Sequence, residues 1–150
     1  MKAFAIMTGP NQLDVMPRAI PDRDALLDLH IGQRTEGGAR EAIRVGVQYL
    51  AAWIGGRGAV PLYGLMEDAA TAEICRMSLW QWRRYAAPLD DGRTFDEGLF
   101  TVLLNEEVAA MSALPHRDEA VVLFAQLVRA EKPVEFLTLP AQHLLDRATN

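Results

Sequence analysis

Apolar residues recur at helical spacing in two long stretches of the sequence, and this periodicity restricts the fold more than any other feature. In the first stretch the intervals between them are four, three and four residues, as shown by Ile43, Val47, Leu50 and Ile54. Such intervals place side chains on one face of an α-helix. The pattern predicts a long amphipathic helix from about Gly38 to Ile54, ended by the glycine-rich run at residues 55–58.

The second stretch predicts a helix from about Asp68 to Tyr85. Its apolar seam repeats at intervals of three, four, three and four, through Ala72, Cys75, Leu79, Trp82 and Ala86. Between the two helices, residues 59–66 read AVPLYGLM and predict a short, buried, extended link. Pro61 argues against a central strand there, because proline donates no hydrogen bond to a sheet.

Further helices are predicted at residues 22–29, with Asp22 as N-cap, and at 117–131, which ends before Pro133. Thr94-Phe95-Asp96-Glu97 resembles a capping box and predicts a helix that lasts to about residue 111. A last short helix starts at Thr138. No convincing two-residue alternation is visible, so we expect an all-α fold: a single bundle of about five or six helices over residues 21–150, after an extended segment at 1–20.

Composition limits the classes of function. The chain has 150 residues, of which 50% are hydrophobic, which is enough for one domain with a real core. A net charge of −5 argues against nucleic acid or an anionic membrane as the main partner. One cysteine gives no internal disulfide, no apolar run reaches about 20 residues, and the N-terminus does not resemble a signal peptide, so we expect a cytoplasmic protein.

Most chemistry-bearing residues have ordinary structural interpretations. The histidines at 30, 116 and 143 lack metal-ligand spacing, and Cys75 lies on an apolar seam as a small hydrophobic residue. Arg83 and Arg84 are expected to be a solvated helix C-terminus. The exception is the pair Glu67-Asp68 at the start of the second long helix. One interpretation is that Asp68 caps the helix, and the other is that it is a base beside a substrate pocket.

The run Leu65–Ile74, LMEDAATAEI, followed by Trp80-Gln81-Trp82, resembles the C-terminal signature of malate synthase, and especially its shorter A form. Other matching pieces occur in the same order along nearly the whole chain: Gly9–Leu13, Thr35-Glu36 with Arg40, Val45–Leu50 with Trp53, Asp90–Arg93 and Phe136–Pro140. The resemblance implies the helical domain that plugs the mouth of a β/α barrel. The barrel itself has no counterpart in these 150 residues.

The resemblance also implies a chemistry. Malate synthases condense acetyl-CoA with glyoxylate, in the glyoxylate cycle, with Mg²⁺. The family's catalytic base maps onto Asp68, Met66 maps near the acyl-thioester end of the pocket, and Glu67 has a supporting role. The family's metal-binding acids and glyoxylate-binding arginine belong to the barrel. We therefore expect this chain alone to bind no metal or cofactor, with Mg²⁺ and a CoA thioester implied only together with a barrel partner.

Three hypotheses remain open at this point. The chain is a stand-alone plug that docks on a separate barrel subunit and supplies Asp68, or an excised part of a full-length malate synthase, or a non-catalytic scaffold. Under the first, the surface around residues 62–66 is expected to be apolar and to contact a barrel of the malate synthase or acyl-CoA lyase type, or a second copy of the chain. Gly64, Glu41-Ala42 and Cys75 depart from the family pattern and suggest an altered substrate.

Overall fold

A computed structural model describes residues 22–28 and 32–148 of the chain. The chain divides into two compact units, residues 1–32 and 33–150. In the first unit, helix α1 spans Arg23–Leu27, and Asp22 caps it by accepting a hydrogen bond from the Ala25 N–H at 2.8 Å. The helix predicted at residues 22–29 is thus confirmed in shorter form. The extended segment predicted for residues 1–20 lies outside the described residues.

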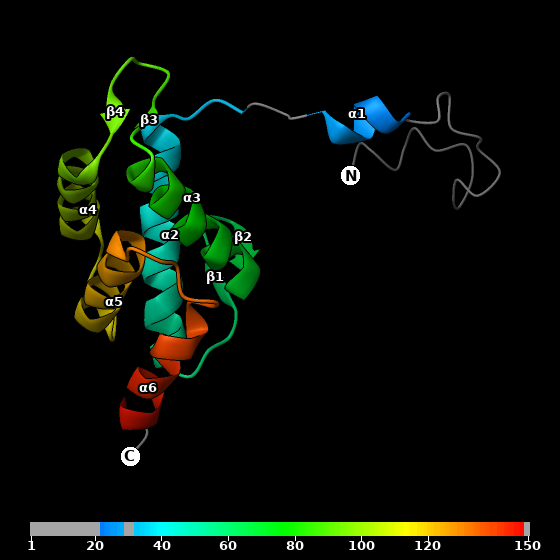
Figure 1. Ribbon diagram of the computed structural model, residues 1–150. Coiled ribbons are helices and arrows are strands. Elements are labelled where there is room, and N and C mark those ends of the chain that lie inside the picture. Colours follow the sequence, from blue (N-terminus) through cyan, green and yellow to red (C-terminus); the bar gives the residue numbers. More distant parts are fainter. Residues whose placement is uncertain (1–21, 29–31, 149–150) are drawn as a thin grey trace, which may run out of the picture. The chain divides into compact units, whose positions relative to one another are not determined.

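The second unit is built around one long helix, α2, which spans Glu36–Ile54. The other elements in chain order are β1 (Val60–Leu62), β2 (Leu65–Glu67), α3 (Ala69–Arg84), β3 (Ala87–Pro88), β4 (Thr94–Phe95), α4 (Glu97–Ala110), α5 (Arg117–Arg129) and α6 (Thr138–Ala148). Helices α3, α4, α5 and α6 all pack against α2 (Figure 1). The predicted all-α bundle is confirmed: among the described residues, five helices form this unit, and α1 belongs to the other unit.

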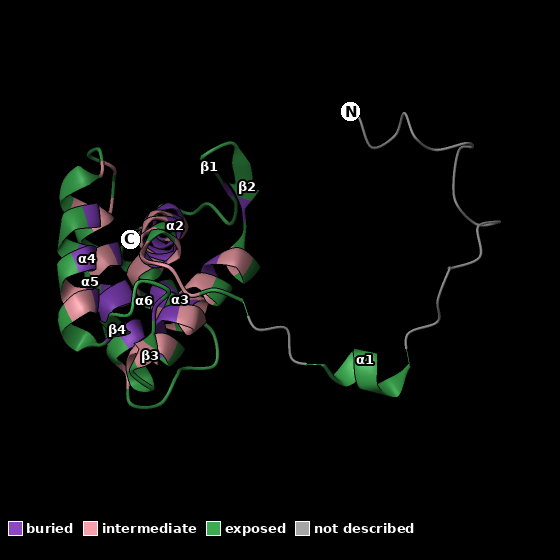
Figure 2. Ribbon diagram, turned by 90° about the horizontal axis from the view of Figure 1, so that it is seen from above, coloured by how far each residue is buried: buried purple, intermediate pink, exposed green. Residues whose placement is uncertain are grey.

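Helix α2 is buried on more faces than a single apolar stripe predicts, as the burial colours of Figure 2 show. Small residues make this possible, because they let neighbouring helices approach the α2 backbone closely. The clearest case is Gly46, where an added Cβ would lie only 2.2 Å from Cε2 of Phe124 on α5. Glycine at this position therefore makes room for the Phe124 ring.

The segment predicted as a buried link forms an antiparallel hairpin instead. Strand β1 pairs with β2 in the register Val60↔Glu67 and Leu62↔Leu65. The turn consists of Tyr63 and Gly64, both with positive φ, 51° and 86°, which suits a tight two-residue hairpin turn. Pro61 is compatible with this arrangement because a two-stranded sheet has only edge strands. Three-residue strands are too short to show period two in the sequence.

Two further expectations were wrong. Thr94 does not cap α4, because Thr94–Phe95 pair with Ala87–Pro88 as strands and bury the Phe95 ring. Asp96 caps α4 instead, accepting a hydrogen bond from the Leu99 N–H at 2.8 Å. Arg83 is not a solvated helix end, since its guanidinium donates to the Val128 and Arg129 carbonyl oxygens at 2.9 and 3.0 Å. It therefore satisfies carbonyls in the last turn of α5.

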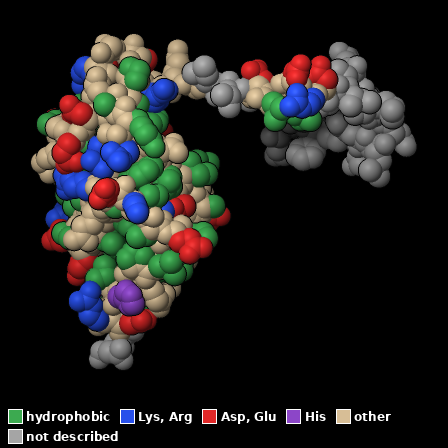
Figure 3. All heavy atoms as spheres, viewed as in Figure 1, with side chains coloured by type: hydrophobic (Ala, Val, Ile, Leu, Met, Phe, Trp, Pro, Cys, Tyr) green, Lys and Arg blue, Asp and Glu red, His purple; other side chains and the backbone are tan. Residues whose placement is uncertain are grey.

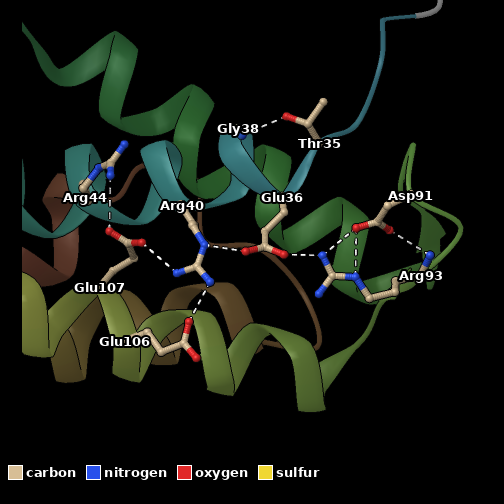
Figure 4. A network of polar contacts seen from close by, with 9 residues as sticks. All are labelled: Thr35, Glu36, Gly38, Arg40, Arg44, Asp91, Arg93, Glu106 and Glu107. Atoms are coloured by element: carbon tan, nitrogen blue, oxygen red, sulfur yellow. Dashed lines mark hydrogen bonds and ion pairs between the residues drawn. The ribbon is translucent and has the colours of Figure 1, made fainter.

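A network of charged side chains joins α2 to α4 and to the turn between β3 and β4 (Figure 4). Arg40 on α2 donates to Glu36 at 2.6 Å, to Glu106 at 2.6 Å and to Glu107 at 2.9 Å. Glu36 also pairs with Arg93, which is held in turn by Asp91. Two of the sequence pieces that carry the family resemblance, residues 35–40 and 90–93, are thus in direct contact.

Among the described residues, no helix combines the length and the apolar character needed to cross a membrane.

Candidate functional site

Asp68 is both a helix cap and an exposed carboxylate. It directly precedes α3 in an extended conformation, and its Oδ1 accepts hydrogen bonds from the Thr71 N–H at 3.0 Å and the Thr71 hydroxyl at 3.4 Å. The side chain is exposed, and no described residue donates a hydrogen bond to Oδ2. The two interpretations of the sequence are therefore compatible, because one oxygen fixes the carboxylate and the other has no hydrogen-bond partner among the described residues.

The two preceding residues point in opposite directions. Met66 is 68% exposed, whereas Glu67 is only 7% exposed. Met66 and Glu67 are successive residues of strand β2 and lie on its opposite faces, although Leu65 at the start of the strand is exposed as well. Met66 and Asp68 therefore both face outward, and Glu67 turns towards the interior. The supporting role expected of Glu67 would act from the buried side of the strand, because Glu67 is not exposed to a ligand at the surface.

Two buried or half-buried groups behind the motif are held in their protonated forms. Burial raises the pKa of Tyr49, and the negative charge of Asp68 raises it further. The Tyr49 hydroxyl donates to the Gly58 carbonyl oxygen at 3.1 Å. Burial also raises the pKa of the Cys75 thiol to about 11, with smaller contributions from the charges of Glu67 and Glu41. Cys75 is thus a poor nucleophile at neutral pH, in agreement with its interpretation as a small hydrophobic residue.

Tyr63 is a site residue that the sequence did not single out. It lies at the tip of the β1–β2 hairpin, where its hydroxyl accepts a hydrogen bond from Nε2 of Gln48 at 2.6 Å. The guanidinium of Arg44 lies over its ring, 5.4 Å from the centroid. Both partners belong to α2, so these contacts hold the hairpin that carries Met66. No local signal reveals them, because the partners are 15 and 19 residues away in sequence.

An apolar groove begins one residue after Asp68. It is lined by the first two turns of α3 and by the segment that leads into α6, through Ala69, Ala70, Glu73, Ile74, Phe136, Leu137 and Thr138. Two of the lining side chains, Ile74 and Phe136, are more than half exposed, and so is Met66, two residues before Asp68. Figure 3 shows hydrophobic side chains gathering over α3 and β2. We call the residues that line this groove, together with Met66 and Asp68, the Asp68 face.

The expectation of an apolar surface around residues 62–66 is confirmed for Tyr63, Leu65 and Met66, whereas Leu62 is buried. Exposed apolar patches of this kind mark surfaces that contact another protein or a ligand. In the part of the chain that the structure describes, no three His, Cys, Asp or Glu side chains gather where they could hold a metal ion. The described residues therefore do not fit the Mg²⁺ that the family resemblance implies.

Comparison with known proteins gives consistent matches over this region. The family model described as "Malate synthase, C-terminal" matches residues 33–145. The chain is 47% identical over 149 residues to a malate synthase of Myxococcus xanthus, covering 93% of the chain and 28% of that relative. It is 43% identical over 145 residues to malate synthase A of Escherichia coli, covering 90% of the chain and 27% of that relative. A bifunctional glyoxylate cycle protein of Caenorhabditis elegans is 43% identical over 142 residues, with 91% and 15% covered.

Proposed function

Because this chain belongs to the malate synthase C-terminal family, we propose that it completes an active site by docking on a separate β/α-barrel subunit. In that site Asp68 is the general base for condensation of an acyl-CoA, acetyl-CoA, with a 2-oxo acid, glyoxylate. The chain spans less than a third of the length of the two bacterial malate synthases described above. The remaining groups of the site therefore come, in this proposal, from a part that these 150 residues do not match.

The observation that carries the proposal is the position of Asp68. Its Oδ1 is fixed by the backbone and side chain of Thr71, Oδ2 accepts no hydrogen bond from the described residues, and the next residue, Ala69, lines an apolar groove. A carboxylate removes a proton from a thioester methyl group only weakly, so it has to be held close to that group. A capping carboxylate meets this need, because its hydrogen bond to the helix fixes its direction without using its second oxygen.

The reaction assigns a role to each of the three motif residues. Asp68 accepts a proton from the acyl methyl group, and the electron pair of the broken C–H bond forms the enolate. The enolate carbon then forms the new C–C bond with the aldehyde carbon of glyoxylate, while the π electrons of the aldehyde move to its oxygen, which takes up a proton. Water hydrolyses the thioester of this product, which releases malate and CoA. Met66, exposed on the same side as Asp68, contacts the thioester end, and Glu67 supports the strand from its buried side. Groups that stabilise the enolate oxygen and bind Mg²⁺ are assigned to the barrel partner, since the described residues do not provide a metal site.

The same chemistry applies if the barrel belongs to the same polypeptide, and Asp68 keeps its role in both arrangements. A non-catalytic scaffold differs, because its contacts would not depend on the basicity of Asp68. The substitution Asp68→Asn separates the two ideas. Asparagine accepts the capping hydrogen bond almost as well as aspartate but is not a base.

The test replaces the matching C-terminal part of Escherichia coli malate synthase A by the full 150-residue chain and follows glyoxylate-dependent release of CoA from acetyl-CoA. We expect D68N to lower kcat by about 10²–10⁴-fold, the usual contribution of a general base. The matched control is Asp96→Asn, because Asp96 caps α4 in the same way and lies outside the Asp68 face. An inactive but folded parent chimera, or a D68N chimera as active as D96N, would overturn the proposal.

A further inference from the structure

A buried arginine on α3 holds the segment that forms one wall of the groove beside Asp68. Arg76 is fully buried, and its Nη2 donates to the Val134 carbonyl oxygen at 3.0 Å. The same nitrogen pairs with Glu73, one turn earlier on α3. The second carboxylate oxygen of Glu73 accepts the Leu137 N–H at 2.9 Å. Two side chains of α3 thus hold the backbone of residues 134–137 at two points.

These contacts are local to the groove. Glu73 itself lines it, and Leu137 is the buried residue between the exposed Phe136 and the half-buried Thr138 on the opposite wall. Residues 134–136 precede α6, which begins at Thr138, and the Phe136 carbonyl oxygen accepts a hydrogen bond from the Leu139 N–H of that helix at 3.2 Å. The Glu73–Arg76 pair therefore anchors this wall at Val134 and at Leu137, in addition to the hydrogen bond between Phe136 and α6.

The pair is costly for the fold. Arg76 Nε and Nη1 are buried and have no hydrogen-bond partner among the described residues. Burial also lowers the pKa of Arg76 from its ordinary value, the direction expected when a cation is desolvated. Replacing such a buried ion pair by apolar side chains often leaves stability unchanged or raises it. A purely stabilising role therefore does not account for Arg76.

We propose that Glu73 and Arg76 are positioning residues, which fix residues 134–137 so that the groove beside Asp68 accepts the apolar part of the acyl thioester. The choice of occupant rests on the proposed function and on two observations. Apart from Thr138 and Glu73, the groove walls are alanine, isoleucine, phenylalanine and leucine side chains, and the Glu73 carboxylate already has partners for both oxygens. The groove also starts next to the carboxylate that has to reach the acyl methyl group.

The first experiment uses the full chain alone and measures hydrogen exchange at the Leu137 amide. In Arg76→Met the Leu137 N–H is expected to exchange at least 10-fold faster, while buried amides of α2 keep their exchange rates. The matched control is Arg83→Met, which removes another α3 arginine that donates to backbone carbonyls, but at the far end of the helix. R83M should leave Leu137 unchanged relative to α2. Equal behaviour of Leu137 in R76M and R83M overturns the proposal.

The second experiment places R76M in the chimera and compares kcat with the KM for acetyl-CoA. A displaced groove wall is expected to raise KM by about 10-fold and to leave kcat within about 3-fold, because Asp68 is untouched. A loss of kcat at unchanged KM overturns the proposal. The double variant Glu73→Ala, Arg76→Met removes both charges; it should show the same KM effect, and a parental KM in it counts against the proposal.

The two proposals fail in different ways. If D68N keeps its kcat while R76M loosens Leu137 and raises KM, the base assignment is wrong and the positioning role stands. If D68N lowers kcat while the Leu137 amide exchanges equally fast in R76M and R83M, the positioning role is wrong and the base assignment stands.

Discussion

The close approach of α5 to α2 at Gly46 gives the sharpest prediction about the fold, the effect of Gly46→Ala. An ideal Cβ at this position would lie 2.2, 2.7 and 3.0 Å from three atoms of the Phe124 ring. The ring is not a flexible chain end, and because Phe124 is only 1% exposed it cannot move aside into solvent without leaving the core. The added methyl group therefore displaces either the ring or the helix that carries it.

The magnitude follows from two opposed effects. Alanine is favoured over glycine in a helix interior by about 1 kcal/mol. Overpacking of a tight core costs typically about 1–3 kcal/mol, and a 2.2 Å contact with a buried aromatic ring belongs at the upper end. We expect G46A to lower the free energy of unfolding by about 2 kcal/mol after the propensity gain is included. Urea denaturation of the full chain, followed by circular dichroism, measures it.

Gly37→Ala is the matched control in the same helix. A Cβ at Gly37 meets only the Thr35 hydroxyl oxygen, at 3.9 Å, and the residue is exposed. G37A should therefore leave stability unchanged or raise it by up to about 1 kcal/mol. In a Phe124→Leu background, which removes the outer ring atoms, G46A should cost at least about 1 kcal/mol less than in the parent. A G46A variant as stable as G37A, or additive costs in the double variant, would refute the reasoning.

Three further outcomes follow from the structure. Asp68→Ala should lower stability by about 1 kcal/mol, through loss of the cap on α3, whereas D68N should stay within about 0.5 kcal/mol of the parent in urea denaturation. The Cys75 thiol should react with iodoacetamide at pH 8 on the order of 100-fold more slowly than a free cysteine, since its pKa is about 11, and Glu67→Gln should speed this reaction because it removes a nearby negative charge. Hydrogen bonds from Arg93 lower the pKa of Asp91 in the folded state below its ordinary value of 3.8. The Asp91–Arg93 pair therefore stabilises the fold fully above pH 3.8, and this stabilisation is lost as the pH falls through the folded-state pKa. The Arg93→Met variant should therefore lose less free energy of unfolding than the parent between about pH 5 and pH 2. An equal loss in the two proteins over this pH range would contradict this.

The helices were predictable because their signals are local. The apolar intervals in residues 43–54 and 72–86 define helical faces within a few turns, and the observed bounds of α2 and α3 differ from the predicted ones by at most two residues. Asp68 as a cap was equally accessible, since a cap hydrogen bond joins residues only three apart. The strands were missed because stretches of two and three residues carry no measurable periodicity.

The cap of α4 shows where a local signal is ambiguous. Thr94 and Asp96 both fit the N-cap position in sequence, and the choice between them depends on where Phe95 lies. The Phe95 ring is fully buried, in contact with the rings of Trp82 and Phe100. With the ring in this position residues 94 and 95 are extended as strand β4, so α4 starts only after Asp96.

The sequence by itself thus determined the helical class of the fold, the position of Asp68 at the start of a helix and, through its resemblance, the chemistry to be tested. Only the tertiary structure decided which charged side chains are buried. Arg76 is buried and Arg83 is half-buried, and they donate to carbonyl oxygens 58 and 45 residues away. A charged group is buried only where distant backbone groups satisfy part of its hydrogen bonding, and such partners come together only when the helices pack.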